Sequence, residues 1–114
     1  MLKGHKVVYL NLRNNNIRSL GCIEIHKLLV SENNEDSCTL ESLNLSLNNI
    51  GQEGVTQLVP ALTQSNCKLN SLNLSVNDIN DNGVNQLVEA LSHMNCKLSS
   101  LNISENKISG EGIN

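Results

Sequence analysis

The chain repeats itself every 29 residues over most of its length, and this period constrains its fold more than any other feature. Aligned on Cys38, Cys67 and Cys96, three segments read CTLESLNLSLNNIGQEGVTQLVPALTQSN, CKLNSLNLSVNDINDNGVNQLVEALSHMN and CKLSSLNISENKISGEGIN. A divergent copy, VVYLNLRNNNIRSLGCIEIHKLL, precedes them. Such self-similarity indicates a stack of like units that bury their apolar faces against one another. We predict one domain, 1–114, with repeats at about 5–37, 38–66, 67–95 and a partial repeat at 96–114.

Each repeat combines two apolar periods. In the second repeat, Leu43 and Leu45 alternate with polar residues, and this period of two predicts a short strand with one buried face. Val55, Leu58 and Leu62 then follow the spacing of an amphipathic helix. Each unit is therefore predicted to be a strand, a turn, a helix and a return loop.

Two features of the predicted helices can be placed from the sequence. Gly51, Asn80 and Ser109 come just before the helical stretches and suit an N-cap. Pro60 falls inside the second helix, where it should kink the helix or loosen the turn before it, because proline lacks a backbone N–H.

Four asparagines follow the predicted strands at a fixed offset. A carboxamide donates and accepts hydrogen bonds together, so a column of them can satisfy backbone groups that the bend between strand and helix leaves unpaired. We predict that this asparagine ladder is structural rather than a binding site. Its members are Asn15, Asn48, Asn77 and Asn106.

The pattern L-x-x-L-x-L-x-x-N-x-I followed by a helix resembles the leucine-rich repeat. The 29-residue period, the leading cysteine and the G-V-x-x-L-x-x-A-L helix are similar to the ribonuclease-inhibitor subtype, which also forms the sensing arrays of NOD-like receptors. The resemblance implies an α/β solenoid, a horseshoe segment of about three and a half repeats. Its parallel strands would line the concave face and its helices the convex face. It also implies a non-catalytic protein-interaction module, and it does not specify the partner.

The concave face is the predicted binding surface. Alternation directs four short rows outward: Tyr9, Asn11 and Arg13; Ser42, Asn44 and Ser46; Ser71, Asn73 and Ser75; and Ser100, Asn102 and Ser104. Tyrosine and arginine often anchor interfaces, so we expect Tyr9 and Arg13 to make the main contacts, with Asn14 and Glu105 at the strand exits. The alternative is that so few repeats form no complete site and these side chains are only solvated.

The cysteines do not predict a metal site. Cys38, Cys67 and Cys96 occupy one position of successive units, which places them in a column about 5 Å or more apart. Zinc needs four ligands within about 2.3 Å of one point. We therefore expect small buried hydrophobic side chains, with Cys22 on the apolar face of the first helix.

The sequence contains no motif that supports catalysis. The three histidines are dispersed, and no nucleophile motif or phosphate-binding glycine loop is present. We predict no enzyme activity and no cofactor.

The net charge is −3 and the eight basic residues are scattered, which argues against a nucleic-acid partner. No apolar run approaches the roughly 18–20 residues of a membrane span, and no signal peptide is recognisable. We expect a cytoplasmic protein.

The ends of the repeat array leave two readings open. A stack needs end units that cover its core, and no obvious cap is seen here. We expect either a piece of a longer array or self-association through exposed ends. In the first case the chain would be a sensing or targeting fragment of a larger receptor or effector, with its catalytic or nucleotide-binding domain elsewhere. Inhibition of a ribonuclease is a third possibility, which would require a longer, charge-complementary array.

Overall fold

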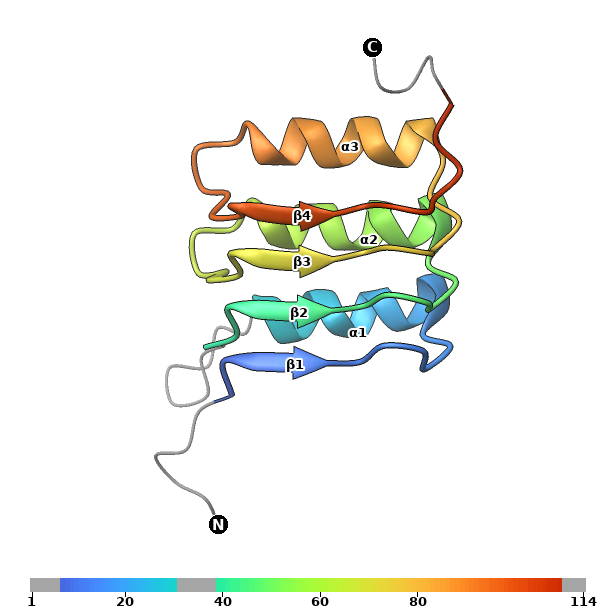
Figure 1. The fold of residues 1–114 in the computed structure, drawn as a ribbon. Coiled ribbons are helices and arrows are strands. Elements are labelled where there is room, and N and C mark those ends of the chain that lie inside the picture. Colours follow the sequence, from blue (N-terminus) through green and yellow to red (C-terminus); the bar gives the residue numbers. More distant parts are fainter. Residues whose placement is uncertain (1–6, 31–38, 110–114) are drawn as a thin grey trace.

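Strands and helices alternate along the chain and form two layers (Figure 1). The computed structural model describes residues 7–30 and 39–109. In that part the elements are β1 (Tyr9–Asn11), α1 (Arg18–Leu29), β2 (Ser42–Asn44), α2 (Gly51–Leu62), β3 (Ser71–Asn73), α3 (Asp81–Leu91) and β4 (Ser100–Asn102). The strands form one parallel sheet in the order β1-β2-β3-β4, and the helices stack beside it. The predicted solenoid of strand–helix units is confirmed.

The strands are paired without any slip between repeats. Leu10, Leu43, Leu72 and Leu101 are direct partners along the sheet, so each repeat position forms a column across the stack. Leu43 and Leu72 are buried against the helices because strands cover them on both sides, whereas Leu10 and Leu101 at the two edges are only half-buried. The hydrophobic core is therefore a continuous spine that thins toward the ends of the stack.

The cysteines of the described chain belong to this spine. Cys22 and Cys67 are buried in the core, and Cys96 is half-buried against it. Cys38 lies outside the described residues. Within 7–30 and 39–109 no three histidine, cysteine or acidic side chains are grouped so that they could hold a metal ion.

A repeated Ile-to-Gly contact shapes the start of each helix. A Cβ atom added to Gly54 would lie 2.3 Å from Ile50 Cγ2 and 3.1 Å from Cys22 Sγ of the preceding helix. The same contact joins Gly21 to Ile17 and Gly83 to Ile79, the residue four positions earlier. Glycine is needed there because the isoleucine methyl group occupies the space of a side chain.

The helix starts differ from one repeat to the next. Asn80 is the N-cap of α3, and its side-chain oxygen accepts a hydrogen bond from Gly83 N at 3.0 Å, as predicted. The prediction for Gly51 was wrong, because Ile50 is the N-cap of α2. Gly51 has a φ of 64°, a left-handed conformation that glycine adopts without strain, and its N–H donates to Asn77 O. The helix predicted after Ser109 lies outside the described residues.

Two further expectations concern the helices. Pro60 lies inside α2, and the helix continues past it to Leu62. In the described part of the chain no helix has both the length and the apolar character needed to cross a bilayer.

Candidate functional site

The candidate site is the surface of the sheet that faces away from the helices, which we call the inner face. It consists of the residues on either side of the central leucine of each strand. In β2 and β3 these flanking residues are half-exposed while the leucine is buried. In β1 and β4 they are exposed. The four strands lie side by side in one sheet (Figure 1), and they thus hold one regular set of polar side chains on a rigid support.

Four asparagines run across the inner face in register and form what we call the amide row: Asn11, Asn44, Asn73 and Asn102. Each Oδ1 accepts a hydrogen bond from the backbone N–H two residues later, at 2.9–3.0 Å. These bonds fix the orientation of each carboxamide, because a flipped amide would place its NH2 group against the backbone N–H. Among the described residues, the four Nδ2 groups have no hydrogen-bond partner. The amide row therefore presents donors spaced about 4.8 Å apart.

The inner face includes fewer residues of each repeat than the alternating pattern predicted. Ser46 is 0% exposed and Ser75 is 9% exposed, so the prediction that they point outward was wrong. The strand stops at Asn44, and the backbone turns at Leu47, which has a φ of 58°. Ser46 Oγ donates to Asn44 Oδ1 at 2.7 Å, and this bond holds the serine against the turn. Ser104 in the last repeat is exposed.

Tyr9 and Arg13 lie in the first repeat, at one end of the inner face. Tyr9 is 57% exposed in β1, and Arg13 is exposed in the turn that follows this strand. Arg13 N donates to Asn11 Oδ1, so the turn ties the arginine to the amide row. Asn14 and Glu105, the predicted strand-exit residues, are exposed and have left-handed φ values of 59° and 54°.

The asparagine ladder lies behind the inner face, where the strands bend toward the helices. Asn48 Oδ1 accepts from Asn15 N at 2.8 Å and from Ile17 N at 3.2 Å. Asn48 Nδ2 donates to the carbonyl oxygens of Leu12, Leu45 and Ser46 at 2.9–3.1 Å. Asn48 is fully buried, and its side-chain donors and acceptor are all used in hydrogen bonds within and between two repeats. It therefore has no group available to bind a ligand.

The other ladder positions repeat this arrangement. Asn77 and Asn106 each accept from two backbone N–H groups of the preceding repeat. Their Nδ2 groups donate to carbonyl oxygens of the preceding turn and of their own turn. Asn15, in the first repeat, donates only to its own turn.

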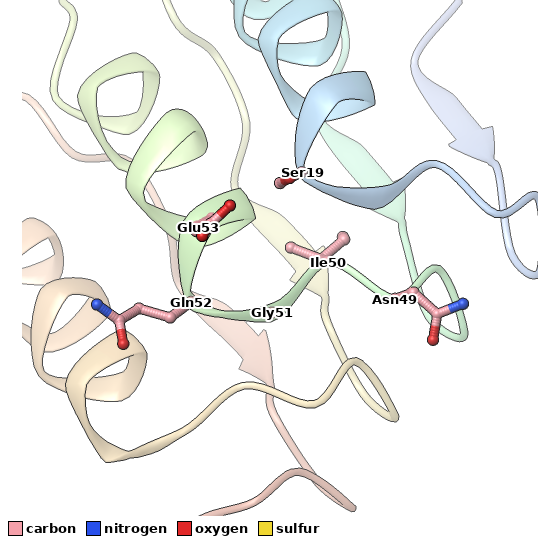
Figure 2. A pocket seen from close by; sticks show the side chains of 6 residues that line it. All are labelled: Ser19, Asn49, Ile50, Gly51, Gln52 and Glu53. Atoms are coloured by element: carbon pink, nitrogen blue, oxygen red, sulfur yellow. The ribbon is translucent and has the colours of Figure 1, made fainter.

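A shallow pocket of about 440 Å³ lies between the starts of α1 and α2 (Figure 2). Ser19 and Glu53 lie on its two sides, and the rest of the lining is Asn49, Ile50, Gly51 and Gln52. No sequence motif marks this pocket, because its residues come from two repeats and are ordinary turn and helix-start residues. No histidine, cysteine or second charged side chain lines it, so its described lining offers no catalytic pair.

In the described part of the chain, the pKa values of Cys22 and Asp81 depart from their ordinary values. Burial raises the pKa of the Cys22 thiol to about 12, so this cysteine stays protonated and acts as a core residue. The pKa of Asp81 is lowered from its ordinary value, first by a hydrogen bond from the Ser109 hydroxyl and then by one from the Ser109 backbone N–H at 2.8 Å. Neither group lies on the inner face.

Comparison with known proteins identifies the repeats. A family model described as "Leucine Rich repeat" matches residues 5–25, 36–59, 65–88 and 95–113, which is more than half of the chain. No curated protein matches the sequence.

Proposed function

Because the chain belongs to the leucine-rich repeat family, whose repeats are typically protein-interaction modules, we propose that it binds a protein partner through the inner face. The observation that carries this proposal is the amide row. Its oxygens are held by the backbone, and its Nδ2 donors are unpartnered among the described residues. A rigid row of this kind loses little conformational freedom when a partner binds.

The amide row favours a partner that presents acceptor oxygens. Backbone carbonyls and carboxylates accept hydrogen bonds from an amide, and a carboxylate can also pair with the Arg13 guanidinium in two parallel bonds. Tyr9 adds an exposed aromatic ring at the same end of the face. We therefore propose that Tyr9 and Arg13 anchor the partner, while Asn11, Asn44 and the rest of the amide row align it.

The finer assignments belong to the same proposal. A ribonuclease-inhibitor-like subtype is supported by the 29-residue period and by the cysteine that leads each later repeat. A cytoplasmic location is supported by the reduced thiol of Cys22 in the core, the form that a reducing compartment maintains. The inner face would then act without catalysis and without binding nucleic acid.

The alternative is a sensing or targeting segment of a larger receptor or effector protein, as in NOD-like receptors. The sequence flanking this segment in its gene separates the two readings. A nucleotide-binding P-loop or a catalytic motif there favours the alternative. Self-association through the ends of the stack uses other residues and is independent of inner-face binding.

A capture experiment with paired variants tests the inner face. The wild-type chain serves as bait, and each captured protein is then purified and its affinity for the bait is measured directly. We expect Tyr9→Ala with Arg13→Ala to weaken binding at least about tenfold, because truncation of interface anchors typically costs this much. A control carries Lys27→Ala and Gln57→Ala, two exposed residues of the helix layer, and should bind like the wild type. Equal affinities of the two double variants would rule out the inner-face assignment.

A further inference from the structure

The hydrogen bonds that the amide oxygens of the asparagine ladder accept from other repeats all come from the preceding repeat. Asn48 N and Ile50 N donate to Asn77 Oδ1 at 2.9 and 3.2 Å. Asn77 N and Ile79 N donate in the same way to Asn106 Oδ1 at 2.8 and 3.0 Å. Each repeat therefore supplies two backbone donors to the repeat that follows it and receives them with one carboxamide oxygen. The ladder Nδ2 groups donate in the opposite sense, to carbonyl oxygens of the preceding repeat, so the two sides of each interface carry different groups.

The two ends of the stack display these two sides separately. At the β4 end, Asn106 N and Ile108 N are the next pair of donors, and within residues 7–30 and 39–109 they have no acceptor. At the β1 end, Asn15 Oδ1 is the next acceptor, and within the same residues it has no donor. β1 and β4 are also the edges of the sheet, each without a further strand on its outer side in the described chain (Figure 1).

The helix layer shows the same division into two sides. The last leucine of each helix is buried in α1 and α2 but exposed in α3, which no described helix follows. We conclude that this position faces the following repeat. The exposed fractions at this position are 1% for Leu29, 2% for Leu62 and 40% for Leu91. Leu91 thus occupies a position that is buried between repeats elsewhere in the stack, but it remains exposed at the β4 end of the described chain.

A second helix position faces the preceding repeat. Ala61 in α2 and Ala90 in α3 are buried there, whereas the equivalent Leu28 in α1 is 43% exposed. The β1 end therefore offers the apolar side chain of Leu28, near the C-terminus of α1, and the acceptor Asn15 in the turn before α1. The β4 end offers Leu91, at the C-terminus of α3, and the two donors in the turn after β4.

We propose that a second copy of this chain docks head to tail on the first, with the α3–β4 end of one copy on the α1–β1 end of the other. Asn106 N and Ile108 N of one copy donate to Asn15 Oδ1 of the other, and Leu91 packs toward Leu28. Two like ends do not reproduce this contact, because one pairing would place the Asn106 and Ile108 N–H groups against their own counterparts and the other would place two Asn15 carboxamides together. The contact is therefore heterologous, so each copy keeps one end free for a further copy. The inner face takes no part, so this proposal is independent of the partner bound there.

Blocked variants of the whole chain test the head-to-tail contact. Leu28→Glu blocks the β1 end and Leu91→Glu blocks the β4 end, and the shared negative charge prevents the two blocked ends from attracting each other. The mass in solution is measured by sedimentation from about 1 µM to about 1 mM, the range of weak association. We expect the mass of the wild type to rise above 12.4 kDa with concentration, while each variant alone stays at that value. An equimolar mixture of the two variants should form a species of twice this mass that does not grow further.

Leu20→Glu is the matched control. Leu20 is 77% exposed on α1, and the equivalent positions in α2 and α3, Glu53 and Asn82, are also exposed, so this site does not face another repeat. The control should associate like the wild type. If a blocked variant fails to fold, hydrogen exchange of the wild type gives a second readout, since the Asn106 and Ile108 amides should exchange more slowly as concentration rises.

Three results would overturn the proposal. The first is a wild type that stays monomeric, with concentration-independent exchange at both amides, over the whole range. The second is a single blocked variant that still dimerises by itself, which indicates a symmetric contact. The third is an equimolar mixture of folded variants that stays monomeric.

Discussion

A single buried carboxamide, that of Asn48, links the turn of its own repeat to the backbone of the repeat before it. It is buried because the turn and the preceding repeat close around it, and it is tolerated there because every polar atom of its side chain has a partner. The constant offset from the strand was enough to locate this side chain in the sequence. Only the structure shows that its oxygen accepts hydrogen bonds from the preceding repeat while its Nδ2 donates back to that repeat.

We predict that Asn48→Ala lowers the free energy of unfolding by about 2–4 kcal/mol, because it leaves several buried backbone groups without partners. Asn15→Ala is the control, since Asn15 is exposed and its side chain bonds only to its own turn. Its cost should stay below about 1 kcal/mol. Urea unfolding of both variants measures the difference, and equal losses would contradict the linking role of Asn48.

Serine residues show what alternation cannot reveal at this scale. Ser42 and Ser46 both stand one step from a leucine in the sequence, yet Ser42 is half-exposed and Ser46 is buried. The difference arises because the strand has ended before Ser46 and the chain has begun to turn. A periodic pattern gives the face of a residue only as long as the strand continues, and the pattern itself does not mark where the strand ends.

Asp81 provides a prediction about pH. Its pKa is lowered in the folded chain by hydrogen bonds from Ser109, so these bonds contribute stability above the ordinary aspartate pKa. This contribution is lost as the pH falls through the lowered folded-state value. An NMR titration should therefore show Asp81 titrating below the ordinary range in the wild type. Ser109→Ala should return it toward the ordinary value, and an unchanged midpoint in this variant would contradict the assigned cause.

The helix start is the element in which local sequence and packing between repeats meet. An isoleucine and a glycine four residues apart recur in all four repeats, and the spacing is visible in the sequence. The reason is visible only in the structure, where Ile50 Cγ2 fills the position that a Gly54 side chain would take. The same glycine lies against Cys22 of the preceding helix, so the contact also sets how closely the two helices approach.

We predict that Gly54→Ala lowers the free energy of unfolding by about 1–3 kcal/mol, the usual cost of overpacking a buried site. The added methyl group and Ile50 compete for one space, so the effect should depend on Ile50. In a double-mutant cycle with Ile50→Ala, Gly54→Ala should cost at least about 1 kcal/mol less than in the wild type. Additive losses would mean that the glycine is required for another reason, such as its contact with Cys22.

At the scale of the whole molecule, stability in a stack depends on neighbours more than on a centre. The period predicted strands in register, and this was correct because equal units bury the most apolar surface when the same positions coincide. Leu10 and Leu101 are only half-buried, because each lies in an edge strand with a neighbouring strand on one side. The sequence did not indicate that, within the described residues, the β4 end has two unpartnered backbone N–H groups and the β1 end has the unpartnered Asn15 Oδ1.

We therefore predict that equivalent leucines contribute unequally to the free energy of unfolding. Leu72 has a strand on each side and is 2% exposed, whereas Leu101 at the sheet edge has one neighbouring strand. Leu72→Ala should lower the free energy of unfolding by about 2–5 kcal/mol, the cost of a cavity in a closed core, and Leu101→Ala by about half as much. Urea unfolding should be measured at about 1 µM, because stacked copies would cover Leu101 and bring the two values together at higher concentration. Equal losses at the low concentration would mean that the last repeat is as well covered as the inner ones, which the exposure of Leu91 and Leu101 contradicts.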